Sequence, residues 1–170
     1  MRLTRVPATR LFTILPVIVI RLALAVPIGF YWKYANDHEN IIQYHKELQQ
    51  SDYSTIATGE HIAAKWSTVL FFWNLAIWVP CLFCILPPFN LPIAVVDIAI
   101  AVCISLATHH QRAYSPPSTS YCSDVHGLQR TWSADDGFFQ NATRLSGTEM
   151  SANELCGTFA REWQLGLSIS

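Results

Sequence analysis

The chain has 170 residues, of which 51% are hydrophobic and 14% are charged, and its formal net charge is -1. Ordinary soluble domains carry about 25% charged residues, so this composition excludes a typical soluble domain, and the small net charge gives no reason to expect nucleic acid as a partner. The charges are segregated, which leaves apolar stretches of membrane-spanning length at residues 11–32, 66–86 and 91–108. We therefore expect an all-α membrane helical bundle with three transmembrane helices.

Residues 1–10 form a basic tail that contains three arginines and no acidic residue. Since Lys and Arg are enriched on the cytosolic side of membrane spans, we expect this tail in the cytosol. The first span, residues 11–32, follows it. A cleaved signal peptide is the alternative interpretation, because Ala23-Leu24-Ala25 resembles the small-residue pattern of a cleavage site. In both cases the chain leaves this segment on the far side of the membrane.

Residues 33–65 are then expected to form a polar loop on the exofacial side. Within this loop, Ile41, Tyr44 and Leu48 recur at helical spacing. This pattern predicts a short amphipathic helix over residues 37–50, which lies on the membrane surface or on the bundle.

The histidines are spread along the chain, and none shows the HxxxH or HExxH spacing that is typical of metal sites. We therefore expect surface histidines, His38 and His45 among them, and neither a metal nor another cofactor. Motifs for nucleotide binding and for a nucleophile elbow are also absent from the sequence. The sequence thus predicts no catalytic residue.

The second span, residues 66–86, begins with Trp66, whose amphipathic ring suits the membrane interface. Pro87 and Pro88 then break the helix, because proline lacks the backbone N–H donor and restricts the residue before it. We therefore expect a tight helical hairpin with a cytosolic turn, from which the third span, residues 91–108, returns to the exofacial side.

Arg21 and Asp97 are the charged residues that fall inside the predicted spans. A charge at membrane depth is costly unless it is paired. At about 1.5 Å per residue, Arg21 lies about 15 Å and Asp97 about 9 Å from the cytosolic ends, and a long arginine side chain can span that difference. We expect an intramembrane ion pair between them. The alternative is a transporter-like subunit that uses them in an ion or proton pathway.

Three crossings place residues 109–170 on the exofacial or lumenal side. Asn141 opens the sequon Asn-Ala-Thr, which can be glycosylated only on that side, so we expect a glycoprotein. An oxidising compartment also permits a disulfide between Cys122 and Cys156. The segment 114–144 is rich in Ser, Pro, Asp and Asn and reads as a long loop.

A helix is predicted to open after this loop. Ser151 and Glu154 have the spacing of a capping box, and apolar residues follow them at helical spacing. This helix reaches Ser170 before it is long enough to cross a membrane, so we expect an incomplete fourth span.

The pair Cys81 and Cys84 forms a CxxC motif, which is typical of thiol oxidoreductases. In the predicted topology both residues lie near the cytosolic end of the second span, whereas Cys122 and Cys156 lie across the membrane. Direct thiol exchange between the two pairs is excluded in that arrangement. A membrane thiol-redox or enzyme-accessory protein therefore stays an alternative function.

The order of these elements resembles the small fungal membrane proteins of the MARVEL-like class. The resemblance rests on the basic tail and first span, the polar loop, and an aromatic second span that reads Val-Leu-Phe-Phe-Trp-Asn-Leu-Ala-Ile-Trp over residues 69–78. A proline-containing turn, a third span with Asp97, and an exofacial loop with Cys122 and Cys156 complete it.

The resemblance implies a four-helix membrane bundle with both termini in the cytosol, which acts in membrane apposition, vesicle trafficking or membrane subdomains and has no catalytic residues. Only the beginning of the fourth span is present, over residues 159–170, so the resemblance also implies a truncated or alternatively spliced member. We accordingly expect a membrane-organising or trafficking component in the plasma membrane or an endomembrane. Its expected partners are the lipid bilayer and other membrane proteins or a second copy of itself.

Overall fold

The computed structural model describes residues 8–49, 53–82, 90–124, 137–147 and 150–170, and every regular element in these ranges is a helix. The all-α prediction is thereby confirmed for the described residues. The elements in chain order are α1 (Ala8–Tyr44), the 3-10 turn η1 (Lys46–Gln49), α2 (Ser54–Leu82), α3 (Asn90–Gln111), the 3-10 turn η4 (Thr119–Asp124), α5 (Phe138–Ser146) and α6 (Ala152–Ile169).

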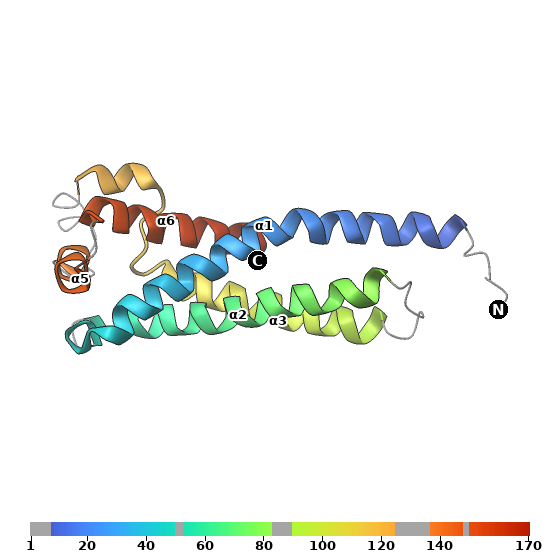
Figure 1. Ribbon diagram of the computed structural model, residues 1–170, viewed down its shortest axis with the longest axis horizontal. Coiled ribbons are helices and arrows are strands. Elements are labelled where there is room, and N and C mark those ends of the chain that lie inside the picture. Colours follow the sequence, from blue (N-terminus) through green and yellow to red (C-terminus); the bar gives the residue numbers. More distant parts are fainter. Residues whose placement is uncertain (1–7, 50–52, 83–89, 125–136, 148–149) are drawn as a thin grey trace.

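The molecule is an elongated bundle in which α1, α2 and α3 run along the long axis (Figure 1). At one end α5, the two 3-10 turns and the first half of α6 gather around these helices. We call this part the head (described residues 34–49, 53–64, 109–124, 137–147 and 150–162). The remainder of the three long helices forms the shaft (residues 8–33, 65–82 and 90–108). Helix α6 extends from the head along only part of the shaft.

Helix α1 is longer than the predicted first span and continues through residues 33–44, where the sequence predicts a polar loop. These residues contain neither glycine nor proline, so nothing ends the helix at the edge of the apolar stretch. Ala35, His38 and Ile42 lie on its buried face. The separate amphipathic helix predicted over residues 37–50 was therefore wrong, because its first part continues α1 and its last part is η1.

The segment 114–144, predicted as a long loop, contains η4 and α5 among its described residues. Helix α5 is amphipathic and buries Phe138 and Ala142. It begins after Gly137 and ends before Gly147, which have φ values of 98° and 59° that favour glycine. The sequence pattern did not predict this helix, because it is short and contains few apolar residues.

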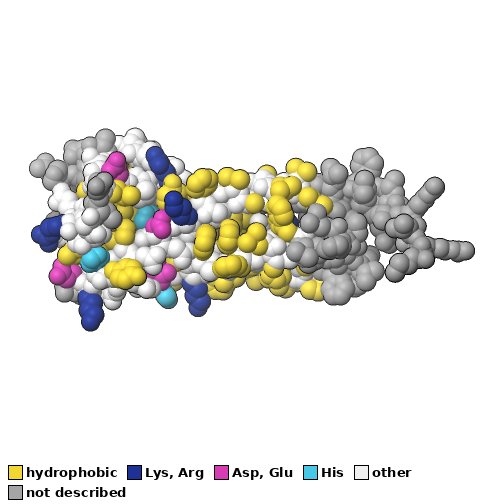
Figure 2. All heavy atoms as spheres, in the orientation of Figure 1, with side chains coloured by type: hydrophobic (Ala, Val, Ile, Leu, Met, Phe, Trp, Pro, Cys, Tyr) yellow, Lys and Arg dark blue, Asp and Glu magenta, His cyan; other side chains and the backbone are white. Residues whose placement is uncertain are grey.

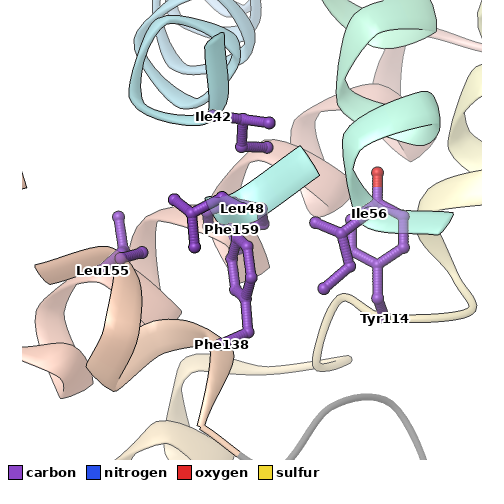
Figure 3. Close-up of a cluster of buried hydrophobic side chains, with 8 residues drawn as sticks. Ile42, Leu48, Ile56, Tyr114, Phe138, Leu155 and Phe159 are labelled. Carbon is purple, nitrogen blue, oxygen red and sulfur yellow. The ribbon is translucent and has the colours of Figure 1, made fainter. Parts of the chain in front are cut away.

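The core of the head is a cluster of apolar side chains from α1, η1, α2, α5, α6 and the segment that follows α3 (Figure 3). Phe159 of α6 lies at its centre, with its ring 5.8 Å from that of Phe138 and 6.4 Å from that of Tyr114. The other buried members are Ile42, Leu48, Ile56, Ala142 and Leu155. A disulfide between Cys122 and Cys156, with the Cα atoms 5.7 Å apart, joins η4 to α6 beside this core.

Helix α6 opens with the predicted capping box, which the structure confirms. The Ser151 hydroxyl accepts a hydrogen bond from the Glu154 amide at 3.3 Å, and the Glu154 carboxylate accepts one from the Ser151 amide at 2.8 Å. At its other end α6 packs closely on the shaft. A Cβ atom added to Gly166 would lie 2.8 Å from the Thr108 hydroxyl and 3.2 Å from the ring of Tyr31.

The shaft carries apolar side chains on its outer surface (Figure 2). Within the described part of the chain, two helical segments are long and apolar enough to cross a membrane, Ile18–Tyr44 and Leu91–Gln111. The predicted second span, residues 66–86, and the Pro87-Pro88 turn reach into residues 79–89, whose side chains lie outside the described part. The structure therefore gives two candidate spans where the sequence predicts three.

Candidate functional site

One polar site lies in the shaft, where Arg21 of α1 contacts Asp97 of α3. The guanidinium donates to Oδ2 of Asp97, while the indole Nε1 of Trp73 on α2 donates to Oδ1 at 2.8 Å. The sequence predicts this ion pair but not Trp73. Both carboxylate oxygens are thus satisfied, and the site joins three helices. A cavity of about 330 Å³ adjoins the pair and is lined mainly by apolar side chains, together with Asn74.

A second polar site lies in the head, and we call it the buried polar cluster. Four helices contribute side chains to it at one level of the bundle, and each of these side chains is at most 2% exposed. The cluster consists of His38 from α1, Glu60 from α2, Gln111 from α3 and Glu162 from α6, with Tyr114 and Thr158 at its edge.

The hydrogen bonds of His38 define which of its ring nitrogens carries the proton. Its Nε2 lies 2.9 Å from the Thr158 hydroxyl, and that hydroxyl donates its own hydrogen to the Leu155 carbonyl at 2.7 Å. Thr158 therefore accepts from Nε2–H of His38. The other nitrogen, Nδ1, contacts Oε2 of Glu162 and lies 3.7 Å from Oε2 of Glu60.

The outer oxygens of the two carboxylates are held by neutral donors. The Tyr114 hydroxyl donates to Oε1 of Glu60 at 2.7 Å. The Gln111 amide nitrogen lies 3.3 Å from the same oxygen and also donates to Oε1 of Glu162. Two buried oxygens, Oε2 of Glu60 and Oε1 of Gln111, have no hydrogen-bond partner among the described residues. Such orphaned acceptors are costly at full burial.

The cluster lies beyond the exposed Lys33 and Lys65, which mark the end of the apolar shaft surface. Burial and the charge of Glu60 raise the pKa of Glu162 to about 8, and this outweighs the opposing effect of His38. Burial would lower the pKa of His38, but the charge and hydrogen bond of Glu162, together with the nearby Glu60, outweigh it and raise that pKa to about 9. The cluster therefore binds its protons more tightly than the free side chains do.

The prediction of surface histidines was wrong for His38. Its side chain is 2% exposed, and potential ligand atoms of His38, Glu60 and Glu162 lie within 4.8 Å of one another. No local motif shows this grouping, because the residues come from three helices that are distant in sequence. The available signal was the position of His38 between Ala35 and Ile42, on one face of a helix that does not end at residue 32.

The remaining predicted sites lie in the head or outside the described residues. Asn141 lies in α5, and its Nδ2, the atom that would carry a glycan, donates to the Tyr53 hydroxyl at 2.9 Å. A glycan at this atom would replace that hydrogen bond. Cys84 lies outside the described residues, as does the side chain of Cys81, so the CxxC hypothesis stays a prediction.

Comparisons with known proteins add no assignment: no family model, no curated protein and no solved structure matches this chain.

Proposed function

We propose that this chain is a multi-pass integral membrane protein that acts as a membrane-organising or trafficking component without catalytic activity. The observation that carries the membrane part of the proposal is the exposed apolar surface of the shaft. Val26 is 63% and Ile98 is 65% exposed, and they are two of many such side chains. Soluble monomers rarely expose contiguous apolar patches of more than a few hundred Å², whereas a bilayer accepts such a surface.

The proposed topology places the N-terminal tail in the cytosol and the head on the exofacial or lumenal side. Two features of the head support this orientation. The Cys122–Cys156 disulfide requires an oxidising compartment, and the Asn141 sequon is usable only in the same compartment. The arginine-rich tail precedes α1, which begins at the end of the shaft opposite the head (Figure 1).

The proposed organising role rests on how the polar side chains are used. Arg21 and Asp97 join α1 to α3, and the buried polar cluster joins α1, α2, α3 and α6. Because these polar side chains contact one another and join helices, they favour a structural role over a catalytic one. The pattern-level resemblance to MARVEL-like proteins suggests membrane apposition, vesicle trafficking or membrane subdomains as its setting.

A transporter-like subunit is the second candidate, favoured by the cavity of about 330 Å³ beside Arg21 and Asp97. A transported ion would have to compete with the contact between these two side chains. The two functions differ in a flux assay on reconstituted vesicles. Ion or proton flux above that of empty vesicles, abolished by Asp97→Asn, would favour the transporter.

The topology is tested by expression in a eukaryotic host. The chain should resist extraction from membranes at alkaline pH and should gain mass that a glycosidase removes. Asn141→Gln and Thr143→Ala should abolish the mass shift, whereas Thr143→Ser keeps the sequon and should retain it. Release of the chain by alkaline extraction, or an unglycosylated chain in a well-expressed sample, would contradict the proposal.

The organising role requires a separate experiment in a cell that expresses the protein. Deletion should redistribute fluorescent markers of a membrane subdomain or of vesicles, and re-expression should restore them. Unchanged distributions of plasma-membrane, Golgi and vesicle markers would contradict this role while leaving the topology intact.

A further inference from the structure

We propose that His38, Glu60 and Glu162 bind one divalent transition-metal ion, for which Zn²⁺ is the best match, at a structural site in the head. This site goes beyond the proposed membrane role. The three side chains come from α1, α2 and α6, and potential ligand atoms of the three lie within 4.8 Å of one another. A bound ion would therefore tie together three helices that are far apart in sequence.

The inner atoms of the cluster are three acceptors that face one another. Because Nε2 of His38 donates to Thr158, the Nδ1 atom of neutral His38 presents a lone pair. This lone pair points toward Oε2 of Glu162 and Oε2 of Glu60. Three lone pairs around one point repel each other unless a proton or a metal cation lies between them. Two carboxylates would neutralise a divalent cation without leaving a net charge in the core.

The surrounding hydrogen bonds have the form of an outer shell around metal ligands. Thr158 orients the imidazole through Nε2, and Tyr114 and Gln111 hold the outer oxygens of the carboxylates. Partners of this kind fix the tautomer and the direction of the ligands in metal sites. The orphaned Oε2 of Glu60 is an independent indication, because it is fully buried and would gain a partner on metal binding.

The donor types and spacing fit zinc. Zn²⁺ takes imidazole and carboxylate ligands at about 2.0 to 2.2 Å, so two ligands in tetrahedral geometry lie about 3.4 Å apart. The separation of 3.7 Å between Nδ1 of His38 and Oε2 of Glu60 is close to that spacing. Metal binding would replace the His38–Glu162 hydrogen bond. A water molecule would supply the fourth ligand of a tetrahedral site. Full burial of the ligands favours a structural over a catalytic site.

The test uses the full chain in detergent micelles, treated with chelator, dialysed, and then exposed to Zn²⁺ alone. We expect about one bound Zn²⁺ per chain by elemental analysis, and a rise in melting temperature of roughly 5 to 10 °C at a hundredfold excess over Kd. Mg²⁺ should give neither result, since it prefers oxygen ligands. A wild-type chain that holds no Zn²⁺ and shows no thermal shift would overturn the proposal.

Variants locate the ion. Glu60→Gln and Glu162→Gln keep the side-chain shape and should lose the Zn²⁺-dependent thermal shift, as should His38→Ala. The matched control is His61→Ala, because His61 follows Glu60 directly but its side chain is 65% exposed. The control should keep both stoichiometry and shift. Retention of both by the glutamine variants would show that the ion binds elsewhere, and that would overturn the proposal.

X-ray absorption at the zinc edge gives a result that does not depend on any variant folding. Ligands should be nitrogen and oxygen at about 2.0 to 2.2 Å. A Zn–S distance of about 2.3 Å would instead place the ion on cysteines and would overturn the proposal.

Discussion

Gly59 of α2 lies directly against the phenol ring of Tyr114. A Cβ atom added to Gly59 would meet Cε1 of Tyr114 at 2.7 Å and Cζ at 2.9 Å. Only glycine allows this approach, which lets the Tyr114 hydroxyl reach the next residue, Glu60, at 2.7 Å. The lack of a side chain at Gly59 thus allows Tyr114 to pack against the buried polar cluster.

Gly59→Ala should therefore destabilise the head. Tyr114 is only 6% exposed, so the extra methyl group should cost about 1 to 3 kcal/mol, more than the helix-propensity gain of about 1 kcal/mol. Thermal unfolding in detergent measures the effect. Gly157→Ala is the matched control, because nothing lies within 4 Å of its added Cβ, and it should be neutral or slightly stabilising. Equal melting temperatures for the two variants would argue against the close contact.

Asp97→Asn should destabilise the shaft by leaving Arg21 without a counter-charge. The cost of an unpaired arginine at the centre of a membrane helix is about 3 kcal/mol on insertion scales, and snorkelling can reduce it. Exchanging Arg21 and Asp97 should recover only part of the loss, because arginine cannot accept the hydrogen bond from Trp73. Trp73→Phe removes only the hydrogen bond from the indole to Asp97, so it measures that bond separately from the ion pair. The measurements are the folded yield and the melting temperature. Identical values for the single variants and for the exchanged pair would contradict the ion pair.

Removing the Cys122–Cys156 disulfide should destabilise the head strongly. The bridged residues are 34 positions apart, and a loop of that length corresponds to about 4 kcal/mol in the chain-entropy model. A Cys122→Ala/Cys156→Ala double variant should therefore melt well below the wild type, whereas Cys103→Ala in α3 should change little. A membrane-impermeant alkylating reagent should label Cys122 and Cys156 only after reduction. Labelling without reduction would contradict the bridge.

The stability of the chelator-treated protein should fall as the pH rises from about 5 to about 9. The pKa of Glu162 is raised from 4.5 to about 8, and the pKa of His38 from 6.5 to about 9. Since the folded chain binds both protons more tightly, their stabilisation is complete below the unfolded values and is lost as pH rises through the folded values. Glu60, Tyr31 and Tyr114 also face these groups.

Chemical unfolding at several pH values measures this slope. Glu162→Gln cannot titrate at this position, so it should flatten the curve between about pH 5 and pH 8. A stability that rises over this range would contradict the proton-holding state of the cluster.

The sequence predicts those features that depend on local composition. The capping box at Ser151 is a short-range pattern, and the apolar stretches that hold Arg21 and Asp97 make a contact between opposite charges favourable. The pairing of Cys122 with Cys156 was predictable because they are the two cysteines of the polar C-terminal part. In each case the sequence alone contains the physical reason.

The buried polar cluster depends on tertiary packing. His38 is 22 residues from Glu60 and 124 from Glu162, and it becomes buried only because α1 continues past the apolar stretch and α6 covers it. From sequence alone, a polar segment between two apolar stretches predicts a solvent-exposed loop. Its burial becomes visible only when the packing of α6 over it is known. The same reasoning explains α5, whose Phe138 and Phe139 pack against Phe159 of α6.

Helix α6 continues without interruption from the head to the shaft, so a single helix connects these two parts of the molecule. Cys156 and Glu162 anchor it in the head, while Gly166 and Ile169 lie against the shaft. Cys156 and Ile169 are separated by about 20 Å of helix. Because the helix is continuous over this length, it connects the disulfide and the buried polar cluster in the head directly to the packing against Tyr31 and Thr108 in the shaft.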